Sequence, residues 1–538
     1  MFERTPQTSH DVVRRLEARY HSQIATGQYQ PFIYPWGTVG AALVILYLLI
    51  DHRRSPILRH CRFLAFAFIC WFAFYTIRTC RALNPASAFG VGLINAWSIL
   101  WCSVMLVFND AQADFKRIER KERSLDRDGN QSNGTTAKAQ DINDPVRKRT
   151  NGFPSEDKVG STQSPAQRSG TFAWQAYPVS PFLERMDWVA DIFCNFRGMG
   201  WNWRISGLPP PPKHVQEDLK HNNATEISDD NTHVSRMGIH RYQTKSTLLR
   251  HNIYIFCRNY LILDLLKTLI AHDPYFWGLK NDPRAPGYLP QSLKSSPVAI
   301  NSARLLISLS AIGLALQFIF SLGPIFFVGI LGPSIIGARG EPWMYPAQFG
   351  SFSIVFEKGL AGWWGGWWHQ TFRYGFEASS TRVVKLLGLD PKSQTAKFLS
   401  LAIAFALSGC LHACGSYTQI GDTRPLMGPL RFFLLQILGV TAQTQTTRWL
   451  GRMGVTQRLP GWVRKGTNFA YTHVWFYYTA PLLVDDFAAG GIWLFEPLPI
   501  SPLRGLGFGS KEDGWWCWSG QIARWHSGKN WWDTGIAL

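Results

Sequence analysis

The sequence has few charged residues for its length. Asp, Glu, Lys and Arg make up 17% of its 538 residues, whereas soluble domains contain roughly 25%. Aromatic residues are abundant instead, with 24 Trp, 17 Tyr and 35 Phe. A soluble fold does not readily bury that much aromatic surface. The shortage of charge therefore argues against an ordinary soluble globular protein.

Cysteine patterns that mark a disulfide framework or a zinc site are also missing. The nine cysteines are odd in number, form no CxxC pair and lie mostly inside apolar runs. Acidic residues are outnumbered by basic ones, 36 against 55, which gives a formal net charge of +19. The basic residues gather near the ends of apolar segments and in one polar stretch. We therefore attribute them to membrane-flanking charge and predict no nucleic-acid partner.

Several catalytic motifs are absent. The sequence has no P-loop, no HExxH and no GxSxG, and the GMG at 198–200 lacks the strand and helix of a dinucleotide-binding fingerprint. Phosphoryl transfer, hydride transfer and metal-dependent peptidase chemistry lose support. We expect no bound cofactor and no metal.

Apolar segments of membrane-span length recur along the chain. Residues 31–50 provide about the twenty residues that a helix needs to cross hydrocarbon, and they start too late for a cleavable signal. Further segments of this kind lie at 63–77, 88–108, 252–271, 303–333, 396–416, 427–447 and 468–484. The segment 303–333 is long enough for two spans or a bent pair. The sequence predicts an all-α, polytopic integral membrane protein with about eight or nine transmembrane helices.

Basic residues predict the orientation and, with hydropathy, the division of the chain. The clusters at 53–62 and 116–123 are separated by two crossings, and both are expected to be cytoplasmic, which places the N-terminus in the lumen. The predicted parts are a polar N-terminal segment (1–30), three transmembrane helices (31–108), a polar cytoplasmic insertion (109–250), a catalytic transmembrane core (251–492) and a Trp-rich tail (493–538). Within the insertion, residues 110–170 have a disorder-prone composition, whereas residues 171–213 are expected to be ordered.

Ionisable residues inside spans are functional candidates, because they are costly there. His412 lies in LAIAFALSGCLHACGSYTQ, where helical spacing places Ser408, His412 and Ser416 on one face. His369 and Gln370 follow four tryptophans in GWWGGWWHQTFR, which is typical of an interfacial or re-entrant segment. Structural alternatives are a histidine bonded between helices and an aromatic belt with an incidental histidine.

Other polar residues in apolar surroundings have plainer interpretations. Asp264 and Lys267 lie about one helical turn apart and are expected to pair with each other. Asp485 and Asp486 end an apolar run and are expected to be solvated at the interface. His473 lies near the start of a span, and the sequence alone leaves its role open.

Three motifs occur in a recognisable order: EPWMYPAQFG (341–350), WWGGWWHQTFR (363–373) and ALSGCLHACGS (406–416). In order and spacing they resemble the wax synthase-like branch of the membrane-bound O-acyltransferases. The upstream FRGMGWNW and LPPPP resemble fungal members, many of which acetylate terpenoid or meroterpenoid alcohols in secondary metabolism. The residues that fill the second and third motifs are Trp364, Gly365, Trp368, His369, Gln370 and Arg373, then Ser408, Gly409 and His412.

The resemblance implies a multi-pass membrane enzyme, expected in the endoplasmic reticulum, that transfers an acetyl or other short acyl group from acyl-CoA to an apolar alcohol. It implies that His412 is the general base, a role that suits an imidazole because its unperturbed pKa of about 6.5 leaves it mostly neutral at cytosolic pH. His369 and Gln370 are expected to donate hydrogen bonds to the thioester carbonyl. Ser408 is a possible nucleophile, but we favour a role in orienting the imidazole, and therefore direct transfer.

The sequence departs from the family pattern at Gly366, where a basic residue is usual, and this departure concerns the binding of the acyl donor. Arg373, or the region of Arg197 and Arg204, is therefore expected to hold the acyl-CoA phosphates, with Trp364 and Trp368 also at the donor site. The expected partners are acyl-CoA, a hydrophobic alcohol and membrane lipids. Two alternatives stay open: a long-chain wax ester synthase that uses fatty alcohol, and a non-catalytic lipid-binding or transport protein. Paired intramembrane charges and inverted repeats, which would favour transport, are scarce.

Overall fold

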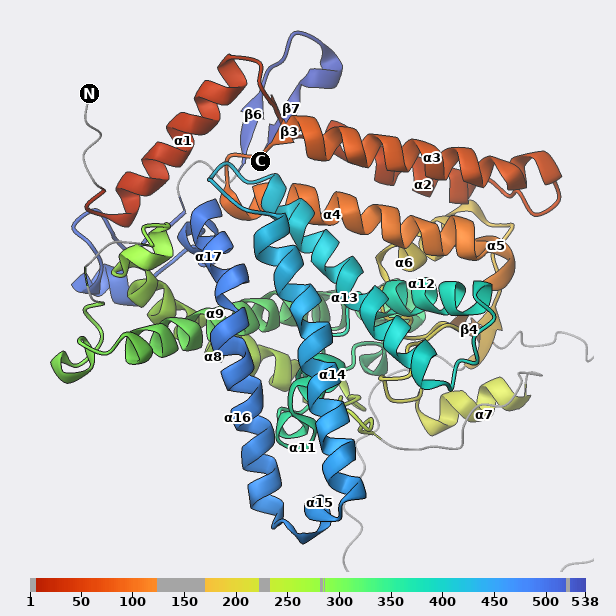
Figure 1. Cartoon of the computed structure of the whole chain (residues 1–538). Helices are drawn as coiled ribbons and strands as arrows, with labels where there is room; N and C mark the ends of the chain where they lie inside the picture. The colour runs from red at the N-terminus through yellow and green to blue at the C-terminus, as the bar shows by residue number, and fades with distance from the viewer. Residues whose placement is uncertain (1–5, 123–169, 222–232, 281–283, 285, 519–522) are drawn as a thin grey trace, which may run out of the picture.

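The structure is a computed structural model that describes residues 6–122, 170–221, 233–280, 284, 286–518 and 523–538. Helices dominate these residues, and strands are few and short (Figure 1). The helices are α1 Ser9–Ala25, α2 Val39–Leu49, α3 Pro56–Thr79, α4 Pro85–Ser103, α5 Ala111–Asp114, α6 Phe182–Cys194, α7 Lys213–His221, α8 Lys245–Ala271, α9 Pro297–Pro324, α10 Pro333–Ile336, α11 Ser353–Gly362, α12 Arg373–Leu386, α13 Gln394–Tyr417, α14 Arg431–Arg452, α15 Val455–Arg458, α16 Gly461–Thr479 and α17 Pro481–Gly490. The strands are β1 Gln30–Pro31, β2 Ile33–Tyr34, β3 Cys80–Arg81, β4 Arg117–Glu122, β5 Gly170–Gln175, β6 Arg524–His526 and β7 Gly535–Ala537.

Among the described residues, five helical runs are long and apolar enough to cross a membrane: Pro56–Thr79, Pro85–Phe108, Pro297–Leu331, Gln394–Tyr417 and Leu426–Arg452. Three of the spanning helices begin with the same local signal, a capping side chain followed by proline at the first helical position. Their capping residues are Ser55, Asn84 and Ser296, each of which accepts a backbone hydrogen bond.

The structure bears on the expected division and number of the spans. Residues 297–331 form one continuous helical run, α9 and a π-helical extension at Ile325–Leu331, so of the alternatives left open for 303–333 the structure does not show two separate spans. The helices α8 and α16 are long enough to span but are not among the five apolar runs, and α8 contains both Asp264 and Lys267. The total of eight or nine spans therefore stays a prediction.

The helix that contains His412, α13, lies inside the bundle, in contact with α4, α12 and α14. Its closest approach is to α4, where a Cβ added at Gly92 would lie 1.9 Å from the carbonyl oxygen of Cys414. The Thr418 hydroxyl accepts a hydrogen bond from the Gly92 N–H at 3.1 Å and donates one to the Ala88 carbonyl at 2.7 Å. Glycine at position 92 thus lets the two backbones meet, as small residues do between membrane helices.

The segment between the apolar run Pro85–Phe108 and α8 contains a small antiparallel sheet. β4 pairs with β5 from Arg117–Gln175 to Glu122–Gly170, and α6 and α7 follow β5. Residues 111–122 are therefore ordered, contrary to the expectation from their composition, because pairing with β5 satisfies the backbone of β4. The remainder of the stretch expected to be disordered lies at 123–169, outside the described residues.

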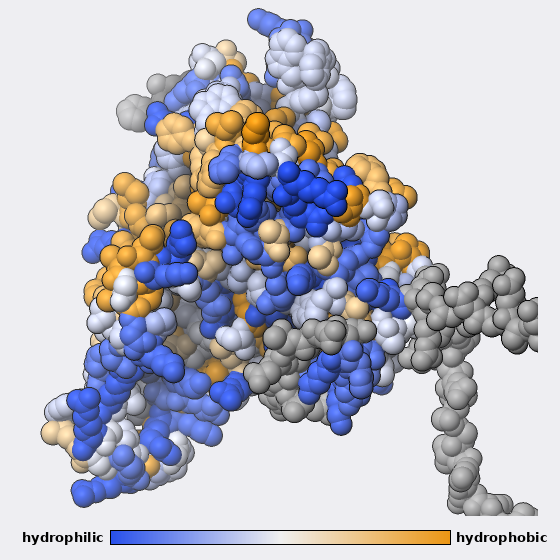
Figure 2. Space-filling view, turned by 90° about the vertical axis from the view of Figure 1, so that its right-hand side faces the viewer, coloured by the Kyte–Doolittle hydropathy of each residue, from blue (hydrophilic) through white to orange (hydrophobic). Residues whose placement is uncertain are grey.

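The face that carries β4, α7 and α12 is hydrophilic over its middle, and hydrophobic side chains gather toward its upper part and left edge (Figure 2). At the opposite end of α3 and α4, residues 33–34 pair with the C-terminal strand of the chain. β2 pairs with β7, and β7 pairs with β6. The Trp36 indole donates a hydrogen bond to the Thr534 carbonyl at 2.8 Å. The Trp-rich tail is thus attached to the N-terminal part of the fold.

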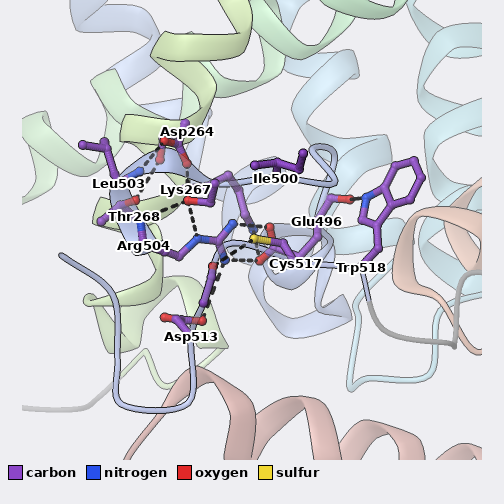
Figure 3. Close-up of polar contacts among 12 residues, drawn as sticks. Asp264, Lys267, Thr268, Glu496, Ile500, Leu503, Arg504, Asp513, Cys517 and Trp518 are labelled. Carbon is purple, nitrogen blue, oxygen red and sulfur yellow. Dashed lines mark hydrogen bonds and ion pairs between the residues drawn. The ribbon is translucent and has the colours of Figure 1, made fainter. Parts of the chain in front are cut away.

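The expected pairing of Asp264 with Lys267 is wrong (Figure 3). Asp264 accepts hydrogen bonds from the Ser501 hydroxyl and from the Leu503 N–H. Lys267 donates to the Trp493 carbonyl and forms an ion pair with Glu496 at 3.7 Å. The partners of both side chains come from the segment after α17, which packs against α8. The spacing of residues within α8 could not reveal them.

The expected solvation of the Asp485–Asp486 pair is wrong for Asp486, which is 5% exposed. Its carboxylate accepts a hydrogen bond from the Arg424 N–H at 2.6 Å. Asp485 accepts one from the Tyr275 hydroxyl at 2.6 Å and pairs with Lys280. The two carboxylates thus connect α17 to neighbouring loops.

Candidate active site

The backbone of α13 fixes the tautomer of His412. Nδ1 of the ring lies 2.8 Å from the carbonyl oxygen of Ser408, one turn earlier. A carbonyl oxygen only accepts, so Nδ1 is the protonated nitrogen of the neutral ring. Nε2 then holds the free lone pair, and no residue of the described chain hydrogen-bonds to it. Ser408 therefore orients the imidazole through its backbone carbonyl.

Aromatic rings flank His412 on two sides. The ring of Phe433 on α14 lies 4.5 Å from the imidazole, centroid to centroid, and the ring of Phe89 on α4 lies at 6.2 Å. Protein atoms crowd the imidazole, yet it keeps accessible surface. A base in these surroundings can meet a substrate while apolar neighbours limit the access of water.

The second motif forms a tight break between α11 and α12. A π-helical turn at Trp363–Trp367 follows α11, and the helix is kinked at Gly359, whose φ of +58° suits glycine. A Cβ at Gly366 would lie 2.6 Å from the Ile354 side chain. The position where the family usually has a basic residue therefore has no room here for a side chain without displacement of Ile354.

His369 lies in this break with an unused ring nitrogen. Its Nδ1 is buried and has no hydrogen-bond partner among the described residues. Burial lowers the pKa of His369, and positive charge on His412 or Arg197 lowers that pKa further. An unpaired polar nitrogen in a buried position is costly unless a ligand meets it.

Gln370 and Arg373 are engaged within the break itself. The Gln370 amide donates to the backbone carbonyls of Trp364 and Trp368, and its oxygen accepts from Arg373 at 2.8 Å. Arg373 also donates to the Gly365 carbonyl and pairs with Glu377 on α12. Both side chains thus hold the shape of the chain around His369.

Replacement of Gln370 by Leu is expected to lower kcat of acyl transfer by about 10- to 100-fold, because two partly buried carbonyls lose their donor and small displacements of reacting groups cost up to about 10² in rate. Steady-state kinetics on purified membranes would measure the change. The control is Gln394→Leu, because Gln394 is exposed at the start of α13. An unchanged kcat in Gln370→Leu would show that catalysis does not depend on the hydrogen bonds of the Gln370 amide.

Trp364 and Trp368 help to form an aromatic wall beside the two histidines. The Trp364 indole donates to Gln436 on α14 at 3.3 Å, and its ring lies 5.7 Å from the ring of Phe405 on α13. The Trp368 ring lies 5.3 Å from the ring of His369. These contacts link the second motif to α13 and α14.

Arg197 and Arg204 lie in the loop after α6. Arg197 is 8% exposed and donates to the carbonyls of Pro346 and Ala347, both at 2.9 Å. Burial lowers the pKa of Arg197 to about 10. Arg204 donates to the carbonyls of Leu208 and Pro209. Neither guanidinium pairs with a carboxylate of the described chain, so both retain charge that can attract an anion.

The fold brings the three sequence motifs together. Arg197 holds the end of the first motif, and the Gly350 N–H of that motif donates to the Trp367 carbonyl of the second at 3.0 Å. The second motif meets α13, the helix of the third motif, where the ring of Trp364 lies 5.7 Å from the ring of Phe405. The candidate residues therefore occupy one region of the molecule.

Sequence reasoning missed the aromatic partners of the two histidines. Phe320 on α9 and Phe349 in the first motif lie 5.6 and 6.0 Å from the ring of His369. Phe433 and Phe89 flank His412. Single phenylalanines in apolar helices give no local signal, because only the packing of separate segments places them beside a histidine.

A comparison with known families matches this same region. Residues 345–435 match the sequence model of the membrane bound O-acyl transferase family. The match contains His369, Gln370, Arg373, Ser408 and His412. Over these residues the chain is similar to the membrane-bound O-acyltransferases. The resemblance found from the three motifs is thereby confirmed.

Curated relatives of this O-acyltransferase-like chain come from fungi. It is 24% identical to the acetyltransferase ple2 of Rhodocybe pseudopiperita over 56% of this chain and 66% of that protein. It is 23% identical to the O-mevalon transferase macI of Penicillium terrestre, over 54% and 60% of the two chains. The acetyltransferase ataH of Aspergillus terreus is 26% identical over 44% of this chain and 77% of its own. The matches thus span just under two thirds of the first two relatives, and no solved structure gives a significant match.

Metal chemistry finds no support in the described part of the chain. No group of three or more His, Cys, Asp or Glu side chains there has the arrangement needed to hold a metal ion. The nine cysteines are all free thiols.

Proposed function

We propose that the protein is an integral membrane acyltransferase of the endoplasmic reticulum that transfers an acetyl or other short acyl group from acyl-CoA to a hydroxyl of an apolar acceptor such as a terpenoid. The observation that supports this most strongly is that Nε2 of His412 is free and that the neighbouring second motif contains a histidine with an unpaired nitrogen. Acetyltransferases among the fungal relatives favour a short acyl group.

The proton transfer follows from the tautomer of His412. Nε2 takes the proton of the acceptor hydroxyl as its oxygen attacks the thioester carbonyl carbon. The tetrahedral intermediate then breaks its carbon–sulfur bond, and His412 returns the proton to the departing CoA sulfur. The products are the ester and free CoA, and the base regains its starting tautomer.

His369 is suited to stabilise the oxygen on which negative charge develops. Its unpaired ring nitrogen donates a hydrogen bond to the thioester carbonyl when that nitrogen carries the proton, a role worth about 3–4 kcal/mol per donor in other acyl transfers. Gln370 acts in this proposal by holding the backbone around His369, because its amide protons already bond to carbonyls.

The donor phosphates are assigned to the basic loop after α6. Arg204 keeps accessible surface and has no carboxylate partner in the described chain. Arg197 and Arg373 add positive charge close to the second motif. CoA reaching the site from the cytoplasmic side and an apolar acceptor arriving through the bilayer would meet at the two histidines.

The test uses membranes from a host that lacks such enzymes. Labelled acetyl-CoA or palmitoyl-CoA is supplied with a panel of terpenoid and fatty alcohols, and products are read by mass spectrometry. Acetyl esters of terpenoid alcohols are the expected products. Palmitoyl esters of fatty alcohols alone would identify a wax ester synthase instead. Absence of transfer from either donor, with the protein present in the membrane, would contradict the proposal.

A further inference from the structure

A groove of about 880 Å³ lies between α9 and α16, outside the two-histidine site. This volume falls within the range of about 300–1,000 Å³ that is usual for small-molecule sites. We call it the α9–α16 groove. Its walls come from α9, from α16, and from Phe352, Trp363 and Trp367 of the second-motif region.

The groove opens on a membrane-spanning surface. Its α9 wall belongs to the apolar run 297–331. Leu306 on α9 is 67% exposed, and Tyr478 on α16 is 74% exposed. Large apolar side chains exposed along a span face lipid hydrocarbon. A molecule dissolved in the bilayer therefore has direct access to the groove.

The groove adjoins the second motif at its inner end. Gly313 and Gln317 line it, and Phe320 continues the same face of α9 at the i, i+4, i+7 spacing. The Phe320 ring lies 5.6 Å from the ring of His369. Trp363 lines the groove and stacks 6.2 Å from Trp368, the residue before His369. The inner end of the groove thus meets the aromatic side chains that surround His369.

His473 gives the groove a hydrogen-bond acceptor. Its Nδ1 lies 2.9 Å from the Phe469 carbonyl, which makes Nδ1 the protonated nitrogen of the neutral ring. Nε2 is then an acceptor, and no residue of the described chain hydrogen-bonds to it. Ser302, Ser310 and Tyr477 add hydroxyl groups to the lining.

The chemistry of the lining selects the occupant. The lining contains no Lys, Arg, Asp or Glu, so a phospholipid headgroup finds no charged partner in it. An apolar body suits the aromatic and aliphatic walls, and a hydroxyl suits the Nε2 of His473. His473 lines the groove, whereas His369 and His412 do not, so we assign to His473 a hydroxyl other than the one that receives the acyl group.

We propose that the α9–α16 groove binds the body of the acceptor, and that His473 accepts a hydrogen bond from a second hydroxyl of that acceptor. This inference rests on the proposed function and makes it more specific. The preferred acceptor is an apolar alcohol with two hydroxyl groups, one at the catalytic histidines and one at His473.

The first test fills the groove. A Cβ at Gly313 meets only the Trp367 ring, at 4.0 Å, so Gly313→Leu extends into the groove without a backbone clash. A photoreactive diazirine derivative of androst-5-ene-3β,17β-diol is the probe. We expect it to label peptides of α9 and α16 in wild-type membranes and labelling to fall by about 10-fold in Gly313→Leu. The control is Gly323→Leu on the same helix, where a Cβ meets open space and which does not line the groove.

This labelling needs no catalysis, so its outcome is separate from that of the proposed function. Labelling confined to other helices, or undiminished in Gly313→Leu, would overturn the groove assignment even if acyl transfer is found. Competition by phosphatidylcholine but not by the unmodified diol would identify the groove as a lipid site and also overturn it.

The second test concerns His473 and uses the acetylation rates of the diol and of androst-5-en-3β-ol, which lacks the 17-hydroxyl. We expect the wild type to prefer the diol in kcat/KM by about 5- to 10-fold, the effect of one hydrogen bond. His473→Phe is expected to remove the preference by raising KM for the diol, and His473→Gln to restore part of it. An equal preference in all three proteins would exclude His473 as the acceptor of that bond.

Discussion

His412→Ala lowers the rate of acyl transfer by about 10²- to 10⁴-fold, the usual contribution of a general base. The reason is the free lone pair on Nε2. The Ser408 carbonyl accepts a hydrogen bond from Nδ1 and so keeps the proton on Nδ1 and the lone pair on Nε2. Alanine removes the proton acceptor, and water cannot readily replace it between the rings of Phe433 and Phe89. Ester formation per unit of membrane protein, at matched expression, measures the effect.

Ser408→Ala separates this account from a covalent mechanism. The backbone carbonyl that orients the imidazole remains in this variant, so most of the activity is expected to remain. In a mechanism with Ser408 as nucleophile, the same change would abolish transfer, and labelled acyl-enzyme would accumulate in the wild type with donor alone. Either result would contradict direct transfer.

Gly92→Ala destabilises the protein by about 3 kcal/mol, the upper part of the usual range for overpacked sites. The added methyl group would lie 1.9 Å from the Cys414 carbonyl oxygen, a backbone atom within the helix that contains His412. To make room, α4 and α13 must separate, which also breaks the bond between the Gly92 N–H and Thr418. Stability is measured in detergent as the temperature at which the monodisperse peak in size-exclusion chromatography is lost. The rate of acyl transfer reports whether His412 is displaced.

Gly90→Ala is the matched control on the same helix. A Cβ at Gly90 has only the Ile94 side chain within 4 Å, at 3.9 Å. Alanine is also the better helix former by up to about 1 kcal/mol. The control is therefore expected to be neutral or slightly stabilising. Equal thermal stability of Gly92→Ala and Gly90→Ala would show that the close contact of α4 with α13 does not stabilise the fold.

Hydropathy predicted the helices whose apolar character is continuous. The apolar segments 88–108, 396–416 and 427–447 each fall within a helical run long enough to span a membrane. Hydropathy could not show that residues 297–331 form one helical run, because helix continuity through Pro324 depends on the backbone. Nor could it show that Asp264 and Lys267 bind the segment after α17, since those partners lie more than 220 residues away in sequence.

The two histidines could be found from sequence because each lies in a motif with a recognisable spacing. Their surroundings could not, because Phe320, Phe349 and Phe433 reach them from separate segments. The sequence assigned Gln370 to the substrate, whereas in the structure its amide protons bond to backbone carbonyls. A side chain's partners depend on local backbone geometry, which a motif does not specify.

The most direct test of the central claim is the ratio of ester formed to CoA released. Membranes with wild-type protein or His412→Ala are incubated with labelled acetyl-CoA and the alcohol that gives the best rate, and both products are counted. Direct transfer through His412 predicts a ratio near one in the wild type and little of either product in the variant. Release of CoA without ester, or equal ester formation by both proteins, would contradict the account.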